Sequence, residues 1–435
     1  TIGVVADLVK AGYVRHIGIT EIDAASQGLA VSGNSSRSVL TSILGRAFYS
    51  YKNRYLLTAT IRRDGSSKFG SNYRYGNFPS VSVGWNIAEE DFVKNSVSWL
   101  DQLKLRGGYG VLGNQEIDNY QYVSVVTTGI NYPDGKSGLI QGAFPKTFAN
   151  PDIKWEETAM TNVGIDFMAL RNRLTLTADW YVKNTKDILL NVPIPISTGG
   201  ANDPIRNAGK IRNQGFEFNL GWNESLNKDL SYGVSFLGTY NKNEVVEMGA
   251  ESQVITGGTI HGGTYTSRTL AGYPIGGFWL IPTDGYFNST EEVQAHQKDG
   301  VLIQPSAEPG DIRFKDTNND GTINDEDRVY CGSPFPKFTY SINGNITYKN
   351  VDFSIGFQGV TGNKIYNATK LELTDVTRGT NYLASTLDYW TPENQNASSP
   401  RLIWTDPNRN ARSESDRYLE SGSYFRLRNL QVGYT

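Results

Sequence analysis

The residues best suited to hold a metal ion lie together in one short stretch, 316–327. It begins DTNNDG, which matches the D-x-[DN]-x-[DN]-G pattern of calcium-binding loops, where the sixth-position glycine permits the turn. Calcium takes about six to eight oxygen ligands, and acids, amides and a backbone carbonyl can supply them. The last position is Asp where Glu is commoner, so a surface turn that binds nothing remains the alternative. The predicted Ca²⁺ ligands, in a structural role, are Asp316, Asn318, Asp320, Thr322 through its carbonyl, and Asp327.

Aromatic side chains in the polar stretches form a second group with binding potential. A flat ring beside polar groups can stack on a sugar or anchor a partner protein. The alternative for each ring is that it packs one loop onto another. The candidate substrate-binding residues are Trp155, Trp279, Trp390 and Trp404.

Catalytic machinery is not indicated. His16, His261 and His296 lie in unrelated segments, with no nucleophile motif or metal-ligand spacing around them. Carboxylate pairs are plentiful, but pairs in a sequence do not define a glycosidase site. The sequence therefore predicts a protein that is not an enzyme. A secreted glycoside hydrolase, which would need a cleft with paired carboxylates, is the weaker alternative.

Composition narrows the class of protein further. The 435 residues carry a net charge of −3, which gives no electrostatic basis for binding nucleic acid. A lone Cys331 excludes an internal disulfide framework. No apolar run reaches the roughly 18 residues that a membrane helix needs. The chain starts without Met or a signal peptide, so we expect it to be a piece of a longer secreted protein.

The stretch 338–359 predicts the main structural element, a two-stranded hairpin. Phe338, Tyr340 and Ile342 alternate with polar residues in its first arm, and Val351 and Phe353 do so in its second. Successive side chains of a strand point to opposite faces, so the hairpin has one apolar and one polar surface. Each arm has about ten residues, which is the length of a strand that crosses a bilayer at a tilt.

The rest of the chain repeats this pattern. About ten strands are predicted, joined alternately by short turns and by long connections, as in the wall of an outer-membrane barrel. We therefore predict an all-β fold, a transmembrane antiparallel β-barrel with long extracellular loops. A soluble, secreted β-rich carbohydrate-binding or adhesive protein with a calcium loop is the main alternative. The long connections span 112–159, 183–213, 241–336 and 361–422, and a slip in the alternation predicts a β-bulge near Asn429.

Five phrases also carry a resemblance to a known family. The chain resembles the SusC-type (RagA/SusC) TonB-dependent outer-membrane transporters of Bacteroidetes from about residue 40 to its end. The phrases are YLLTATIRRDGSSKFG (55–70), FPSVSVGWNIAEEDF (78–92), WLDQLKLRGGYG (99–110), GDIRFKDTNNDGTINDEDR (310–328) and SYFRLRNLQVGYT (423–435).

This resemblance implies a fold, a location and partners. It implies that residues 40–435 belong to a 22-stranded barrel in the cell outer membrane, in contact with its lipid. Residues 1–39 would be an extracellular loop or partial strand, and the plug and terminal strands would be absent. The family imports oligosaccharides or peptides with a SusD-like surface lipoprotein. TonB energises this import through an N-terminal region that we expect to be missing here.

Overall fold

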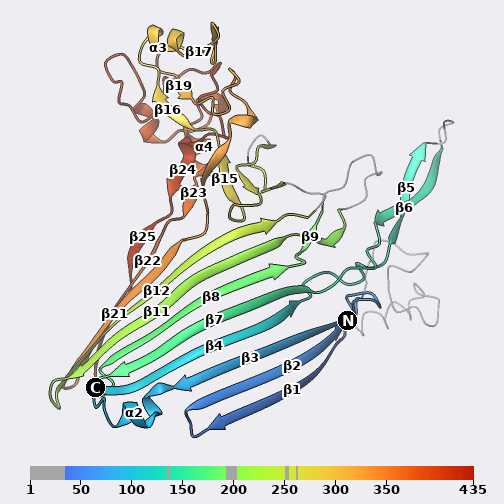
Figure 1. Cartoon of the computed structure of the whole chain (residues 1–435). Helices are drawn as coiled ribbons and strands as arrows, with labels where there is room; N and C mark the ends of the chain where they lie inside the picture. Colours follow the sequence, from blue (N-terminus) through green and yellow to red (C-terminus); the bar gives the residue numbers. More distant parts are fainter. Residues whose placement is uncertain (1–34, 134, 136–137, 193–202, 250–253, 261–262) are drawn as a thin grey trace, which may run out of the picture.

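The computed structural model describes residues 35–133, 135, 138–192, 203–249, 254–260 and 263–435. Most of the predicted segment 1–39 therefore lies outside the described residues, as do His16 and His261. The described part consists of one large antiparallel sheet and of smaller elements in the connections between its strands (Figure 1).

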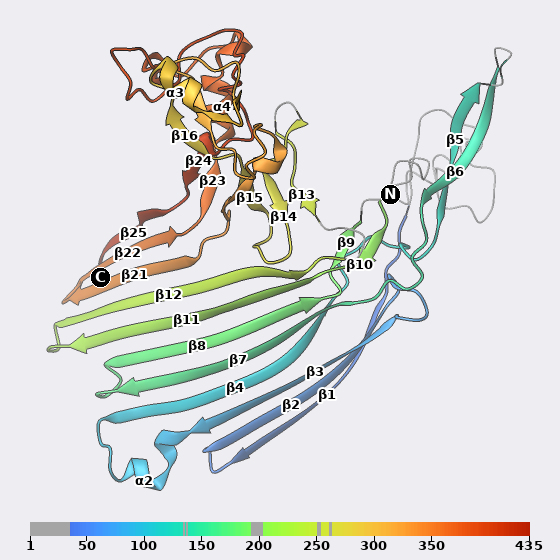
Figure 2. The same ribbon diagram turned by 45° about the horizontal axis from the view of Figure 1, so that its top comes forward.

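The main sheet has eleven strands, in agreement with the predicted all-β fold. Each strand pairs with its neighbours in chain order, and β1 and β25 are its two edges. Figure 2 shows that the sheet is twisted and curved. The strands are β1 (Leu40–Tyr51), β2 (Tyr55–Ser66), β3 (Tyr75–Asn86), β4 (Leu100–Asn114), β7 (Glu156–Ala169), β8 (Leu174–Lys186), β11 (Lys210–Ser225), β12 (Leu230–Glu247), β21 (Phe338–Tyr348), β22 (Val351–Thr361) and β25 (Tyr424–Tyr434).

The predicted hairpin is present as β21 and β22. Ile342 lies opposite Phe357 and Ile346 lies opposite Phe353, so the apolar residues of both arms share one face, as expected. The register of β22 with β25 shifts where Gly356 meets Asn429, which confirms the predicted bulge. A bulge of this kind adds local twist without ending the pairing.

The connections alternate between the two ends of the strands. At one end, the turn side, the chain reverses at 52–54, 87–99, 170–173, 226–229 and 349–350. The segment 87–99 contains a short helix, α2 (Asp91–Lys94), after a 3-10 turn, η2 (Ile87–Glu89). The other end, the loop side, carries the connections 67–74, 115–155, 187–209, 248–337 and 362–423. This layout agrees with the predicted alternation of turns and loops.

The loop-side connections contain secondary structure of their own. Figures 1 and 2 show β5 and β6 as a hairpin that projects away from the main sheet. The strands are β5 (Val125–Pro133), β6 (Leu139–Thr147), β9 (Leu189–Asn191), β10 (Ile205–Asn207), β13 (Ile255–Thr256), β14 (Ser267–Thr269), β15 (Gly277–Leu280), β16 (Thr283–Tyr286), β17 (Gln297–Lys298), β18 (Val301–Leu302), β19 (Ile312–Phe314), β20 (Val329–Gly332), β23 (Lys364–Tyr366) and β24 (Leu419–Ser421). The helices are α3 (Thr290–Ala295), α4 (Ala368–Thr374) and the 3-10 turns η5 (Asp325–Asp327), η6 (Val376–Arg378), η7 (Ala384–Leu387) and η8 (Asp416–Tyr418).

The strands extend further toward the loop side than their alternation predicts. The polar, glycine-rich stretch 64–77 does not alternate, but β2 continues to Ser66 and β3 already begins at Tyr75. Likewise, β12 continues to Glu247. Backbone pairing needs no apolar side chains, so the hydrogen-bond ladder continues where both faces have become polar.

Candidate functional site

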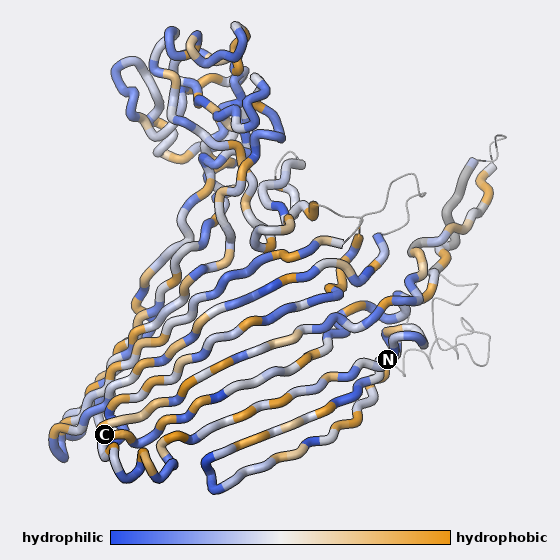
Figure 3. The backbone as a smooth tube through the Cα atoms, viewed as in Figure 1, coloured by the Kyte–Doolittle hydropathy of each residue, from blue (hydrophilic) through white to orange (hydrophobic). Residues whose placement is uncertain are grey.

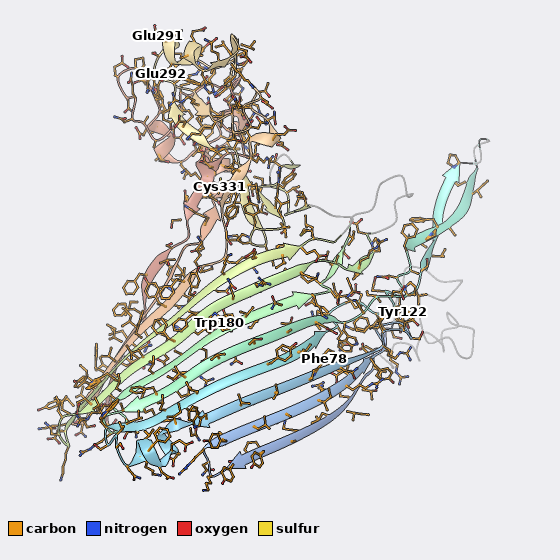
Figure 4. The ribbon with its side chains drawn as sticks, viewed as in Figure 1. Phe78, Tyr122, Trp180, Glu291, Glu292 and Cys331 are labelled. Carbon is orange, nitrogen blue, oxygen red and sulfur yellow. The ribbon has the colours of Figure 1, made fainter. Side chains whose placement is uncertain are left out.

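One face of the main sheet, here called the apolar face, is apolar from edge to edge. Residues opposite one another on neighbouring strands point to the same face, so the register links them into rows. Trp180 lies within the sheet and pairs with Val163 and Phe216 (Figure 4). The next row toward the turns contains only apolar residues and glycine. Its members are Tyr55, Trp85, Leu105, Ile165, Ala178, Phe218, Gly238, Tyr340, Gly359 and Phe425.

The apolar residues of this face form a band that runs obliquely to the rows. In β2 the band extends from Tyr55 toward the loop side as far as Ile61, and in β25 from Phe425 toward the turn side as far as Tyr434. Tyr55 and Phe425 belong to one row, but they lie at opposite margins of the band. With about 3.3 Å per residue and about 4.8 Å between strands, the strands tilt by roughly 30° to the normal of the band. Strands in closed barrels tilt in a similar way.

The apolar band has no covering layer in the described part of the chain. Ile43 is 73% exposed, and Val163, well inside the sheet, is 53% exposed. The buried apolar clusters lie in the loop-side connections and at the adjoining strand ends. Figure 3 shows hydrophobic positions spread along the strands of the main sheet. Soluble proteins rarely expose an apolar surface of this extent, so the band requires an apolar surrounding.

No helix in the described ranges has the length and apolar character required to cross a membrane.

The opposite face of the main sheet is polar and carries a cluster of charges. Arg106 donates hydrogen bonds to Asp166, at 2.8 and 3.0 Å, and to Asp179, at 3.0 Å. Gly164 lies between them, and a Cβ at this position would meet both the Asp179 carboxylate and the Arg106 guanidinium. No motif in the sequence marks these three residues. The signal that could have found them is their position, since all three charges occupy polar places in the alternation.

Trp155 lies in a buried cluster at the loop-side rim of the sheet. It is 5% exposed, and its ring lies 5.1 Å from Phe69 and 5.3 Å from Phe78. Its indole N–H donates to the carbonyl of Arg74. Figure 4 shows Phe78 near the rim of the sheet. Trp155 therefore packs one loop onto another, which is the alternative role given above for these rings. Its ring is not accessible to a ligand in this structure.

Two long connections fold together into one loop unit, defined as residues 277–332 and 364–421 (Figure 1). The Arg401 guanidinium donates to both carboxylate oxygens of Asp311, at 2.6 and 2.9 Å, and Asp311 is fully buried. The buried amide of Gln304 donates to Asn408 at 2.9 Å. Arg401 and Asn408 come from the second connection and their partners from the first. Long-range polar contacts therefore hold the loop unit together.

The other three candidate tryptophans lie in or beside this unit. Trp390 is 6% exposed and donates to Asn288 at 3.1 Å. Trp279 packs edge-on against Tyr273, with ring centroids 4.8 Å apart. Trp404 is 62% exposed. The structure therefore does not bring the four rings together into one site, and Trp404 is the candidate with an open ring.

The structure brings the predicted calcium ligands into a single loop of this unit. Asp316 accepts the backbone N–H groups of Asp320 and Gly321, at 3.1 and 2.7 Å. Asp320 accepts the side-chain amides of Asn318 and Asn324, both at 3.0 Å. The hydrogen bond from the Asn318 amide, followed by those from Thr322, lowers the pKa of Asp320 to about 2. Asp320 is therefore a carboxylate at neutral pH.

Asp327 has a different role in the same loop. It is fully buried, and its two oxygens accept the backbone N–H groups of Thr317 and Asn324, at 2.7 and 2.8 Å. Among the described residues, no group of three or more His, Cys, Asp or Glu side chains could hold a metal ion. Hydrogen bonds close the loop as it stands, and calcium binding stays a prediction, with Asp316, Asp320 and the neutral oxygens as its remaining predicted ligands.

The loop unit also contains two side chains of reactive types, Cys331 and His296. Cys331 lies at its base (Figure 4), where burial raises the pKa of its thiol and disfavours the reactive thiolate. His296 packs on Phe287 with ring centroids 5.5 Å apart, and burial lowers its pKa. Neither residue has the surroundings of a nucleophile or of a general base.

Comparison with known proteins gives a consistent family match. Residues 22–318 match the family model described as TonB dependent receptor-like, beta-barrel. The chain is 30% identical over 427 residues to TonB-dependent receptor P3 of Formosa agariphila, covering 98% of this chain and 41% of that protein. It is also 30% identical over 411 residues to TonB-dependent receptor SusC of Bacteroides thetaiotaomicron, covering 92% of this chain and 38% of that protein.

Solved structures agree at the level of the fold. The structure of the RagAB peptide transporter superposes with a TM-score of 0.75 at 24% identity, over 95% of this chain and 43% of that chain. The RagAB peptide importer in its open-open state gives 0.74 at 23% identity. The chain therefore spans roughly two fifths of the length of the proteins it matches.

Proposed function

Since the chain belongs to the TonB-dependent receptor β-barrel family, we propose that it forms part of the wall of an outer-membrane nutrient importer. The uncovered apolar band is the observation that carries this proposal. In an outer-membrane barrel such a band faces the lipid, and the polar face, with Arg106, Asp166 and Asp179, lines the lumen. A soluble carbohydrate-binding protein would have to cover the band with a second layer.

The cargo and the partners follow from the same proposal. The cargo would be an oligosaccharide or a peptide. The likeness to SusC of B. thetaiotaomicron and to the RagAB peptide transporter supports this range. A SusD-like lipoprotein would dock on the loop side, and TonB would supply the energy from the periplasm. The family consists of transporters and receptors, and the proposed role includes no catalytic step.

We also propose calcium as a structural ion of loop 316–327. Asp316 and Asp320 would supply carboxylate oxygens, Asn318 its amide oxygen and Thr322 its carbonyl oxygen, all of which suit this cation. Asp327, which already accepts two backbone N–H groups, would close the loop instead of binding the ion. The ion would stiffen the loop and take no part in transport chemistry.

Cysteine labelling of whole cells tests the proposed topology. In the full-length protein, with Cys331 replaced by Ser, a single cysteine replaces either Val301 on the loop side or Leu226 on the turn side. Both positions are well exposed, at 68% and 60%. We expect a membrane-impermeant maleimide to label Val301→Cys on intact cells, and Leu226→Cys only after permeabilisation. Equal labelling of both, or a protein released without detergent, would overturn the proposal.

A further inference from the structure

We propose that a cluster of cations at the loop-side margin of the apolar band binds the phosphate groups of an anionic membrane lipid. This basic cluster consists of Lys186 on β8, Lys210 and Arg212 on β11, and Lys242 on β12. The inference rests on the proposed membrane location and adds a specific lipid contact to it.

The register places the basic cluster on the apolar face. The row Trp180, Phe216, Tyr240 and Phe338 forms the loop-side margin of the band on these strands, with Val182 two residues further along β8. Continuing along the same face, Lys242 lies two residues beyond Tyr240, and Arg212 lies four residues before Phe216. Lys186 lies six residues beyond Trp180. Figure 3 shows these loop-side strand ends as predominantly hydrophilic. The cations therefore begin with Lys242, where the apolar band ends, and extend about 13 Å further toward the loop side at about 3.3 Å per residue.

The pairing inside the cluster is unusual for a sheet. Lys186 and Lys210 lie directly opposite each other on neighbouring strands. Like charges in this arrangement repel. Each lysine has one carboxylate beside it, because Glu157 lies opposite Lys186 and Glu247 lies opposite Lys210 on the outer sides of the pair. Arg212 lies one position further along the same face, opposite Asn184, and donates to the Asn184 amide oxygen at 2.9 Å. Three cations thus lie on the adjacent edges of two strands.

Acidic neighbours compensate this charge only in part. Lys186 pairs with Glu157 at 2.9 Å, Lys242 pairs with Glu244 at 2.7 Å, and Lys210 pairs with Glu247. The three lysine side chains are each 53% exposed, and ion pairs this exposed contribute little to stability. Asp187, which also acts on Lys186, pairs with Lys154 at 3.0 Å. With these two residues included, five cations against four carboxylates leave a positive surface, and the lysines can exchange a carboxylate for a phosphate at low cost. The Arg212 guanidinium can bind a phosphate with two parallel hydrogen bonds.

A phosphate-bearing lipid fits this surface better than a free anion or a protein. Its acyl chains would lie along the apolar band below Tyr240 and Phe338, and its headgroup would reach the cluster above them. Aromatic rings at such a margin are typical of a membrane interface. A free phosphate would use the cations but not the adjoining apolar surface.

The test uses the full-length protein, purified from its outer membrane, in nanodiscs of phosphatidylethanolamine. Diphosphoryl lipid A or its dephosphorylated form is added, and retained lipid is counted by native mass spectrometry. We expect the parent protein to retain the phosphorylated form preferentially. Arg212→Gln should weaken that retention about tenfold or more, the usual effect of losing one charge-assisted hydrogen bond. The matched control is Lys183→Gln, which removes a cation on the polar face of the neighbouring strand β8.

The outcomes distinguish a failure of the inference from a failure of the proposed function. Equal retention of both lipids, or equal losses in Arg212→Gln and Lys183→Gln, would overturn the inference alone. Displacement of the lipid by millimolar inorganic phosphate would also overturn it, since the site would then be one for free anions. A protein that does not enter the bilayer at all would overturn the proposed function, and the inference with it.

Discussion

At the scale of single residues, neighbours in one strand are expected to meet opposite surroundings. Ile342 of β21 lies in the row of Phe236 and Phe357 on the apolar face. Asn343, the next residue, lies on the polar face opposite Ser235, to which it donates a hydrogen bond. Both side chains are exposed in the chain as described, so burial in protein does not distinguish them. If the sheet is the wall of a membrane barrel, lipid surrounds Ile342 and water surrounds Asn343.

This difference predicts opposite responses to the same substitution. We expect Ile342→Arg to destabilise the assembled barrel by about 2–4 kcal/mol, because a charge near mid-bilayer loses its hydration. We expect Asn343→Arg to be tolerated, because it faces water. The measurement is the urea concentration at the midpoint of barrel unfolding, monitored by the heat-modifiable mobility of the barrel on gels. Similar midpoints for the two variants would contradict a lipid-facing band.

At the scale of elements, the loop unit depends on contacts between distant segments. One such contact is the pair of hydrogen bonds from Arg401 to the buried Asp311, which also accepts a hydrogen bond from Asn410 at 2.8 Å. Removing the arginine leaves a buried carboxylate without its cation, whereas the main sheet contributes no partner to this contact.

Arg401→Met should therefore destabilise the loop unit by about 3–5 kcal/mol. The barrel itself should assemble normally. The readout is chymotrypsin cleavage between residues 283 and 328 as a function of urea, alongside barrel mobility on gels. The matched control is Lys370→Met, which breaks the exposed Lys370–Glu420 pair of the same unit and should cost less than about 1 kcal/mol. Equal effects of the two substitutions would show that the contact between Arg401 and Asp311 is not what holds the unit together.

The calcium loop is a second element with its own test. Replacing Asp316 and Asp320 together by Ala should raise protease sensitivity within 280–336, because the loop loses both its internal acceptors and the proposed ion. A chelator should cause the same change in the parent protein and no further change in the double variant. Asp284→Ala, which removes a half-exposed carboxylate of the same unit that pairs with Arg313 and Lys315, serves as control. If the chelator has no effect on the parent, hydrogen bonds alone close the loop.

At the scale of the whole molecule, the oblique course of the apolar band fixes the tilt of the strands. Phe218 and Phe425 lie in the same row of the sheet, but Phe218 is near the middle of the band and Phe425 is at its loop-side margin. Both rings pack on aromatic neighbours, Phe218 on Phe236 at 5.3 Å and Phe425 on Phe357 at 5.2 Å. Phe218 and Phe425 therefore have similar surroundings but lie at different depths in the apolar band.

Arginine substitutions at Phe218 and Phe425 should lower the stability of the barrel by different amounts, because the two positions differ in depth. Phe218→Arg should cost about 2–4 kcal/mol of barrel stability, and Phe425→Arg no more than about 1 kcal/mol beyond the lost ring packing, because charges near the interface stay hydrated. Phe218→Ala and Phe425→Ala measure the packing loss and are subtracted. Equal net costs for the two arginines would mean that the rows run parallel to the membrane and that the strands are not tilted.

The sequence alone determined the local features of this protein. Alternation of period two identified the strands and their apolar face, because successive residues of a strand face opposite sides and match the polarity of the side they face. It also placed the bulge near Asn429 and the alternation of turns and long connections. These features depend on neighbours in the chain, so a single sequence is enough to predict them.

Only the tertiary structure decided what depends on neighbours in space. Pairing alone aligns Arg106 with Asp166 and Asp179 across three strands, and places Lys186 opposite Lys210. Folding of two distant connections into one unit buries Trp390 and leaves Trp404 exposed. Strand ends beyond the apolar band could not be predicted either, because backbone hydrogen bonds continue there without any side-chain pattern to record them.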